Sequence, residues 1–292
     1  MKTGDGFVDV EGGRVWFEVV GAGSRIPLLV LHGGPGFTHE YCRSLEGLAD
    51  KRPVVFYDQL GCGHSERPDD PSLWTVERYV AELAEIRRAL GLDRLHILGQ
   101  SWGTMLATEY MLAAGRTGIT SLVLASPCIS VSRWVADAER LKAALPPPVM
   151  EAIESHERQA FFACPEYAAA TLAYYKRHLC RLDPWPVELE RAFAGHSAQV
   201  YETMWGPAEW SVTGSLANFD RSDHLSEITV PTLLTCGRFD EATPETTGWY
   251  AAKMPNSELM VFEESAHMAH LEERDRYLQV VGDFLTRAEG QV

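Results

Sequence analysis

Four short apolar runs in the first half of the chain limit its fold more than any other feature. Runs of four residues without polar alternation are typical of strands buried on both faces; they are Leu28–Leu31, Val54–Tyr57, Leu95–Leu98 and Leu122–Ala125. A helical pattern over Val76–Leu90 places its apolar residues near one face, and Gly91 follows it as a stop. This alternation predicts an α/β fold, with a mostly parallel sheet flanked by crossover helices.

The two ends of the chain add further elements to this pattern. Phe7–Val10 and Val15–Val20 predict an opening hairpin with its turn at Gly12-Gly13. Strand character returns at Thr232–Cys236 and Leu259–Phe262, and the chain closes with a predicted helix over Arg274–Arg287.

The alternation of strands and helices stops after Ser126-Pro127. From residue 128 to residue 229 the sequence is helix-like, rich in aromatic residues and interrupted by prolines. We interpret residues 1–127 and 230–292 as one α/β core, and residues 128–229 as a helical cap inserted into it. Peripheral helices without a functional role are the alternative interpretation.

Composition disfavours several classes of partner. The chain has 41 acidic and 26 basic residues, a formal net charge of −15, which argues against nucleic acid or an anionic membrane. Met1–Gly13 lacks the features of a signal peptide, and no apolar run approaches the roughly 18 residues of a spanning helix. The six cysteines lack CxxC spacing, so we expect reduced thiols in a cytoplasmic protein, with neither a disulfide framework nor a metal site.

The strongest chemical signal is the pentapeptide GQSWG at Gly99–Gly103. It follows the strand Leu95–Leu98 and precedes a helical run over Thr104–Ala114, which is the context of a nucleophile elbow. The glycines allow a sharp turn, and the helix N-terminus directs free N–H groups at the serine. Ser101 is therefore the predicted nucleophile. A chance match in a loop is the alternative, which this context disfavours.

A serine hydroxyl needs a base that is oriented by a third group. In folds with this elbow the chain order is serine, acid, histidine. Asp240 follows the strand Thr232–Cys236 and His267 follows Leu259–Phe262, so both loops should open at the sheet edge that carries the elbow. These residues complete a predicted triad of Ser101, Asp240 and His267.

Four other residues are rivals for these two roles. Glu241 is a second candidate acid and His270 a second candidate base, which we expect to be structural or solvated. Asp220 and Asp223 precede the returning strand and are weaker candidates.

The glycine-rich stretch HGGPG at His32–Gly36 follows the strand Leu28–Leu31. Backbone N–H groups without side chains can face a scissile carbonyl, and losing one such donor typically costs about 10²–10³ in rate. We assign the oxyanion hole to the N–H groups of Gly34 and Trp102, the residue after the nucleophile. A tight structural turn is the other role of such a loop.

With these motifs the chain resembles the proline iminopeptidases and the related tricorn-associated aminopeptidases, over nearly its whole length. Further stretches that match are Asp58–Ser65, Pro165–Tyr167, His178–Arg181, Trp185-Pro186, Gly206–Glu209 and Gly237–Pro244. The resemblance implies an α/β-hydrolase fold with a cap and a serine mechanism that needs no metal or organic cofactor.

The resemblance also implies that Glu209 and Glu241 hold the protonated α-amine of the substrate. An amine with a pKa of about 7.7–8.0 is mostly cationic at neutral pH, and carboxylates are its natural partners. Two anions at a set distance from Ser101 would admit one residue before the cleaved bond. For both glutamates a solvated, purely structural carboxylate is the alternative.

Several other residues of interest have a structural interpretation. We expect Asp58 to tie down the loop that follows Val54–Tyr57. Trp205 and Trp210 replace a small polar residue and a phenylalanine that are usual in the relatives, which leaves the preferred first residue open. Six aromatic residues either line an apolar pocket or belong to the core; they are Trp205, Trp210, Phe161, Phe162, Tyr174 and Tyr175.

We therefore predict a serine aminopeptidase that releases an N-terminal residue, proline or another small or apolar one, through an aminoacyl-enzyme. Its partner is a small peptide or aminoacyl amide with a free amino terminus. One alternative is an amidase or esterase that cleaves an aminoacyl group from a small molecule. The other is a ligand-binding homologue without turnover.

Overall fold

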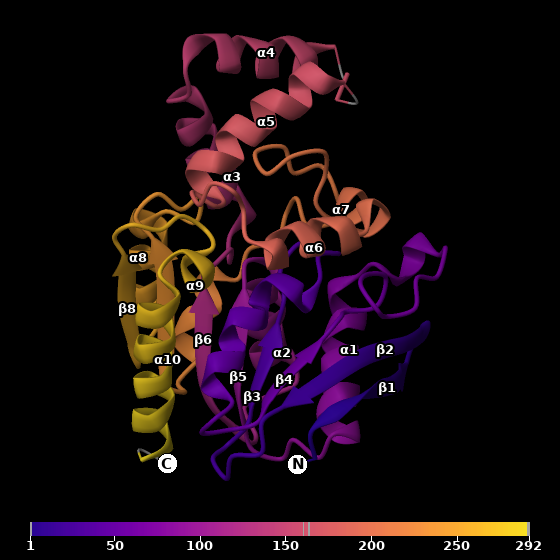
Figure 1. Ribbon diagram of the computed structural model, residues 1–292, viewed down its shortest axis with the longest axis vertical. Helices are drawn as coiled ribbons and strands as arrows, with labels where there is room; N and C mark the ends of the chain where they lie inside the picture. Colours follow the sequence, from indigo (N-terminus) through magenta and orange to yellow (C-terminus); the bar gives the residue numbers. More distant parts are fainter. Residues whose placement is uncertain (1, 160, 163, 291–292) are drawn as a thin grey trace.

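The computed structural model describes residues 2–159, 161–162 and 164–290, and its centre is an eight-stranded sheet (Figure 1). The strands follow the spatial order β1-β2-β4-β3-β5-β6-β7-β8. The pairs β1–β2 and β2–β4 are antiparallel, and the other neighbours are parallel. Their bounds are β1 Gly4–Val10, β2 Gly13–Val20, β3 Leu28–Leu31, β4 Val54–Tyr57, β5 Leu95–Gln100, β6 Ile119–Ala125, β7 Thr232–Gly237 and β8 Ser257–Phe262.

Helices cover both faces of this sheet. One face packs on α1 (Val76–Ala89), α2 (Trp102–Ala113) and α8 (Pro244–Lys253). The other packs on the 3₁₀ segment η1 (His39–Leu48) and on α10 (Arg274–Glu289). Three shorter elements are η2 (Pro71–Leu73), η3 (Ser222–Glu227) and α9 (Ala269–Glu272).

Each central strand supplies side chains to both faces, as the continuous apolar runs predict. In β3, Leu29 and Leu31 join the core cluster under α1 and α2, whereas Leu28 and Val30 join the cluster under η1 and α10. All four side chains are buried. The predicted bounds of β3 and β4 are confirmed, and those of α1 are confirmed to within one residue.

The opening hairpin differs from its prediction in one detail. Its turn lies at Glu11-Gly12 and not at Gly12-Gly13, because Gly13 already pairs with Val10. Gly13 therefore belongs to β2, and β1 begins at Gly4, three residues before the apolar pattern.

The strand order reverses between β3 and β5. The chain passes from β3 to β4 on one side of the sheet and returns to β5 on the other side. Loops that leave neighbouring strands in opposite directions open a crevice at the carboxyl ends of those strands. The glycine-rich loop after β3 and Ser101 after β5 border this crevice.

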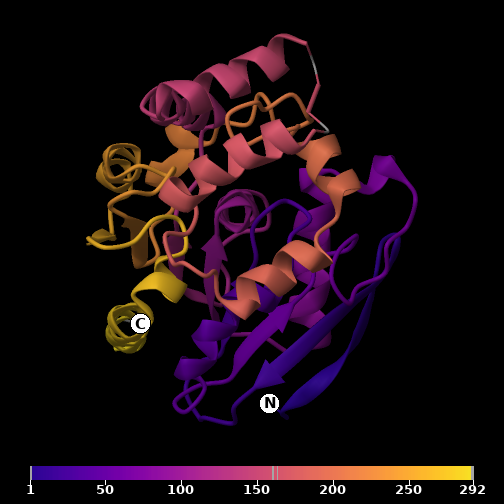
Figure 2. The same ribbon diagram turned by 45° about the horizontal axis from the view of Figure 1, so that its top comes forward.

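Five helices lie beyond the carboxyl ends of the strands, away from the two chain termini (Figures 1 and 2). The segment that carries them begins and ends side by side, since the Val131 N–H donates to the Phe219 carbonyl and the Arg221 N–H donates to the Ile129 carbonyl. The five are α3 Val131–Ala143, α4 Pro147–Arg158, α5 Pro165–His178, α6 Val187–Gly195 and α7 Ala198–Met204.

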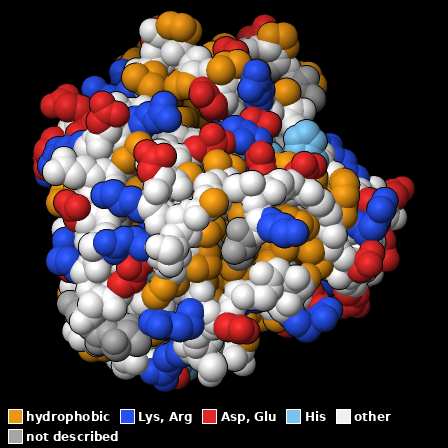
Figure 3. Space-filling view, turned by 60° about the horizontal axis from the view of Figure 1, so that its bottom comes forward, with side chains coloured by type: hydrophobic (Ala, Val, Ile, Leu, Met, Phe, Trp, Pro, Cys, Tyr) orange, Lys and Arg blue, Asp and Glu red, His pale blue; other side chains and the backbone are white. Residues whose placement is uncertain are grey.

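The underside of the molecule, which Figure 3 turns towards the viewer, has a surface of mixed charge. Acidic and basic side chains are interspersed there, with hydrophobic side chains gathered towards the centre of the view (Figure 3). In the part of the chain that the structure describes, no helix has the length and apolar character needed to cross a bilayer.

Candidate active site

Ser101 stands on a strained turn between β5 and α2. Its backbone has φ 54° and ψ −122°, a conformation that a residue with a side chain adopts only where the surroundings impose it. A Cβ atom on Gly99 would overlap the Gly103 carbonyl oxygen, and one on Gly103 would overlap the Leu31 carbonyl oxygen. The turn therefore requires glycine at both flanking positions, which is the physical content of the GxSxG pattern.

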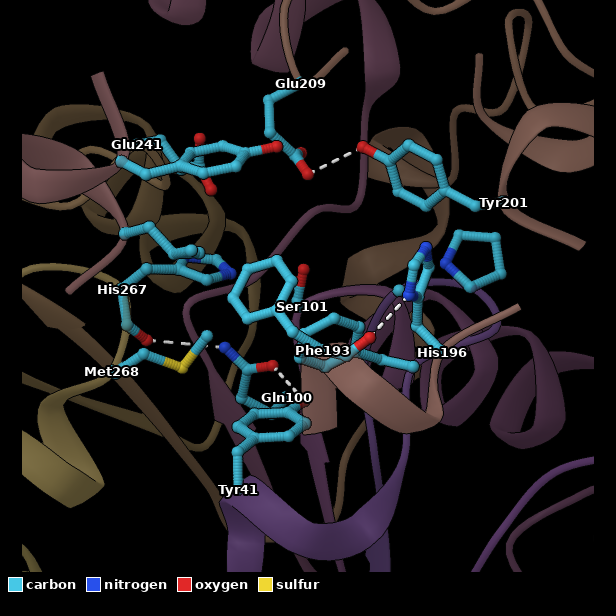
Figure 4. A pocket seen from close by; sticks show the side chains of 15 residues that line it. Tyr41, Gln100, Ser101, Phe193, His196, Tyr201, Glu209, Glu241, His267 and Met268 are labelled. Atoms are coloured by element: carbon cyan, nitrogen blue, oxygen red, sulfur yellow. Dashed lines mark hydrogen bonds between the residues drawn. The ribbon is translucent and has the colours of Figure 1, made fainter. Parts of the chain in front are cut away.

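The structure brings Asp240 and His267 together from the loops after β7 and β8. His267 Nδ1 lies 2.7 Å from Asp240 Oδ1. The same oxygen accepts the Ala242 N–H at 2.8 Å, and Oδ2 accepts the Gly237 N–H at 3.2 Å. Both side chains are buried, and His267 lines one cavity with Ser101 (Figure 4).

The rival candidates lie elsewhere or make other contacts. His270 is only 3% exposed and its Nε2 contacts the Tyr41 carbonyl at 3.1 Å, so it is structural and the solvated alternative is wrong. Asp220 accepts from Ser130 and from the Ser222 N–H. The side chain of Asp223 is exposed on the surface.

Two successive backbone N–H groups of the glycine-rich loop have different surroundings. The Gly33 N–H donates to the Tyr41 hydroxyl at 2.6 Å, and that hydroxyl donates to Gln100 Oε1 at 2.5 Å. The next N–H belongs to Gly34, which lines the cavity with Ser101. Trp102 is the first residue of α2, so its N–H has no acceptor within the helix.

The cavity at Ser101 is small, about 130 Å³, and its walls come from the core and from the segment 128–229. Glu209 and Glu241 both line it, at the end away from Gln100 and Tyr41 (Figure 4). Tyr201 donates its hydroxyl to Glu209 Oε1 at 2.7 Å. Glu241 is buried, and its Oε2 has no hydrogen-bond partner within the described residues.

Both glutamates are held in an environment that opposes their negative charge. Removal from water raises the pKa of Glu209, partly offset by the Tyr201 hydrogen bond and by His267. Burial also raises the pKa of Glu241 well above its usual value, and the nearby charges of Glu209 and Asp240 add to this rise. A cation placed between the two carboxylates would relieve this repulsion.

Three contacts at the site were not predicted from the sequence. Ser126 directly follows β6, has φ 50°, and donates to Asp240 Oδ2 at 2.7 Å. Trp134 lies edge-on to the His267 ring at 5.7 Å between centroids. The third contact is Tyr201 on Glu209. A serine at the end of a strand beside the elbow strand was the only sequence signal available for Ser126.

The remaining residues of interest are structural or line a second depression. Asp58 accepts from the His39 N–H, the His39 ring and the His64 N–H, each at 2.8 Å, and so ties down its loop as expected. Tyr175 lines the cavity at Ser101 and, with Phe162, also a more open groove of about 910 Å³. Trp205, Trp210 and Tyr174 are buried, while Phe161 is exposed.

Comparison with known proteins places this chain in a family. A family model described as alpha/beta hydrolase fold matches residues 26–274. A proline iminopeptidase from Heyndrickxia coagulans is 48% identical over 283 residues, which cover 96% of this chain and 98% of that protein. The chain belongs to the proline iminopeptidase family of α/β hydrolases.

Solved structures agree with this membership. The crystal structure of VinJ has a TM-score of 0.94 and 37% identity, covering 98% of this chain and 99% of that one. The proline iminopeptidase of Mycobacterium smegmatis has a TM-score of 0.90 and 34% identity, covering 98% of both chains. The predicted α/β-hydrolase fold, the predicted enzyme class and the resemblance to proline iminopeptidases are confirmed.

Proposed function

We propose that this protein is a serine aminopeptidase that releases the first residue, proline or another small or apolar one, from peptides or aminoacyl amides. One observation carries the proposal: two carboxylates, Glu209 and Glu241, face the cavity that holds Ser101. Oε2 of Glu241 is buried without a partner among the described residues. An unpaired buried carboxylate is costly, and a bound ammonium group offsets that cost with charge-assisted hydrogen bonds.

The proposed reaction begins with attack of Ser101 Oγ on the carbonyl carbon of the first residue. His267 takes the serine proton, while Asp240 accepts the Nδ1–H and keeps the imidazole in the right tautomer. Negative charge on the carbonyl oxygen is stabilised by the N–H groups of Gly34 and Trp102. The C–N bond then breaks, and His267 gives the proton to the leaving amine.

Water completes the cycle by attacking the aminoacyl ester on Ser101. His267 removes a proton from this water, and the second tetrahedral intermediate collapses to the free amino acid as His267 returns that proton to Ser101 Oγ. The small cavity and the two carboxylates together fix how much substrate lies on the acyl side of the bond. On this proposal, the ammonium group held at Glu241 and the carbonyl attacked by Ser101 belong to the same residue.

We assign residues 128–229 to a cap over a core made of residues 1–127 and 230–292. This division is supported by the adjacent start and end of the segment. It is also supported by the cavity lining, because Tyr175, Phe193 and Glu209 come from the segment, whereas Ser101 and His267 come from the core. We place the protein in the cytoplasm, since all six cysteines are free and buried.

The decisive experiment compares free and blocked amino termini. We expect the enzyme to cleave aminoacyl nitroanilides and to leave their N-acetylated forms intact, because an amide offers neither the charge nor the donors that the carboxylates require. A panel of substrates that differ in their first residue, proline among them, would rank the enzyme's preference for that residue. Undiminished cleavage of acetylated substrates would leave a broad amidase or esterase, and no turnover in the whole panel would favour a ligand-binding protein.

Two glutamate variants separate substrate binding from damage to the triad. Losing one partner of a desolvated charge pair costs about 2–5 kcal/mol, roughly two to three decades of kcat/KM. Glu209→Gln and Glu241→Gln should show this loss on an amine substrate and a much smaller loss on an ester without an amine. Equal losses on both substrates would make Glu241 a support for Asp240. Ser101→Ala is the matched control, since it should lose activity on both substrates.

A further inference from the structure

Gln59 connects the two loops that carry the candidate oxyanion-hole N–H groups. Its side-chain Nε2 donates to the His32 carbonyl at 2.9 Å, and its Oε1 accepts the Trp102 indole N–H at 2.8 Å. Gln59, His32 and Trp102 are all buried, with exposed fractions of at most 1%. One amide group therefore spans the gap between the loop after β3 and the N-terminus of α2.

The backbone of Gln59 makes a further connection to the same loop. Its N–H donates to His32 Nε2 at 3.0 Å, so this nitrogen carries no proton. The proton of the neutral ring is then on Nδ1, which donates to the Gly33 carbonyl at 2.9 Å. Burial lowers the pKa of His32 to about 4, which keeps the ring neutral at the pH values of interest.

The contact with the Gly33 carbonyl bears directly on the oxyanion hole. The Gly33 carbonyl and the Gly34 N–H belong to one planar trans peptide group, in which the two bonds point in opposite directions. Holding the carbonyl therefore aims the Gly34 N–H. On the other side, holding the indole ring of Trp102 fixes the residue whose backbone N–H is the second donor.

We propose that Gln59 is a positioning residue that sets the direction and separation of the Gly34 and Trp102 N–H groups. The proposal rests on the oxyanion hole assigned under the proposed function. The role needs a donor and an acceptor on one side chain, and a neutral amide supplies both. An ionised carboxylate at the same position would lack the donor, and a methionine there would lack both groups.

The first test is Gln59→Met, which keeps the length of the side chain and removes both hydrogen bonds. A misplacement of about 1 Å at a reacting centre costs on the order of 10²-fold. We expect kcat per titrated active site to fall about ten- to hundredfold, with KM nearly unchanged. Affinity for an amino aldehyde, which forms a hemiacetal with Ser101, should fall by the same factor. Affinity for the product amino acid should not change.

A merely structural role would give a different result. It would lower the melting temperature and the fraction of active sites, while kcat per active site and the ratio of the two affinities stayed at wild-type values. That result would overturn the proposal. The same loss of kcat is expected on an ester without an amine. The outcome therefore does not depend on whether the enzyme prefers substrates with a free amino terminus.

The second test is Gln59→Glu, which keeps the shape of the side chain if Gln59→Met fails to fold. Its protonated carboxyl can still donate to the His32 carbonyl and accept from Trp102, whereas the carboxylate cannot donate. The activity of Gln59→Glu relative to wild type should therefore rise as pH falls. A ratio that is constant with pH, or that falls on acidification, would contradict the proposal. Trp102→Phe, which keeps the backbone N–H, should add little to the effect of Gln59→Met.

Discussion

Ser126 donates its hydroxyl to Oδ2 of Asp240 at 2.7 Å, while Oδ1 of the same carboxylate faces His267. A hydrogen bond to a charged group contributes about 1.5–3 kcal/mol, and 1.4 kcal/mol is a factor of ten. We expect Ser126→Ala to lower kcat roughly ten- to hundredfold in steady-state assays with little change in KM. Ser130→Ala is the control, because Ser130 donates to Asp220 at the same distance. Equal kcat in both variants would remove Ser126 from the site.

The close contact of Gly103 with β3 predicts a large effect on stability. In Gly103→Ala the new methyl would overlap the Leu31 carbonyl oxygen, and neither backbone can yield. We expect a loss of more than about 3 kcal/mol in the free energy of unfolding, at the upper end of single substitutions. Gly248→Ala in α8 is the control, since its Cβ would meet only Leu259 at 3.6 Å. Helix propensity favours alanine there by up to about 1 kcal/mol. Thermal or urea unfolding of both variants measures the contrast.

The raised pKa of Glu241 predicts that Glu241→Gln stabilises the free enzyme. A carboxyl whose pKa is higher in the folded than in the unfolded state binds more protons when folded, so its cost appears as pH rises above the unfolded value. Glutamine never ionises and avoids this cost. The gain in melting temperature of Glu241→Gln over wild type should therefore be small near pH 4 and grow towards pH 8. A gain that shrinks with rising pH would contradict this assignment.

The same pKa shifts predict how substrate preference depends on pH. On the proposed mechanism, amine and ester substrates share His267, but only the amine uses the carboxylates of Glu209 and Glu241. Because the pKa of each glutamate is raised, each takes up a proton at a higher pH than an ordinary glutamate does. As the pH is lowered, the ratio of kcat/KM for the amine substrate to kcat/KM for the ester should fall. The fall should begin at a pH above the range in which ordinary carboxyl groups take up a proton. A ratio that does not vary between pH 8 and pH 5 would mean that these glutamates do not bind the amine.

Much of the fold follows from the sequence, because buried strands leave a clear apolar pattern. β3 and β4 are buried along their whole length, and their bounds match the prediction. β1 and β8 were predicted too short, since these edge strands have exposed residues at Gly4 and Glu258 and are held there by backbone pairing. β5 continues through Gly99-Gln100, which pair with β6 although the apolar run ends at Leu98.

Less of the site than of the fold could be predicted from the sequence. Ser101, Asp240 and His267 lie in recognisable loops, and the structure brings the last two within hydrogen-bond distance. The contact of Ser126 with Asp240 depends on β6 lying beside β7 and on a positive φ, neither of which a sequence pattern reveals. Gln59 likewise acts through two residues that are 27 and 43 positions away.

The chain order of these residues has a consequence for the protein during its synthesis. Ser101 lies in the first half of the chain, but Asp240 and His267 follow β7 and β8, the last two strands at the edge of the sheet. With the proposed triad, a chain synthesised only as far as residue 230 holds the nucleophile without its acid or its base. We therefore expect a growing polypeptide to have no hydrolase activity before Asp240 and His267 have emerged, and fragments that stop short of them to be inert.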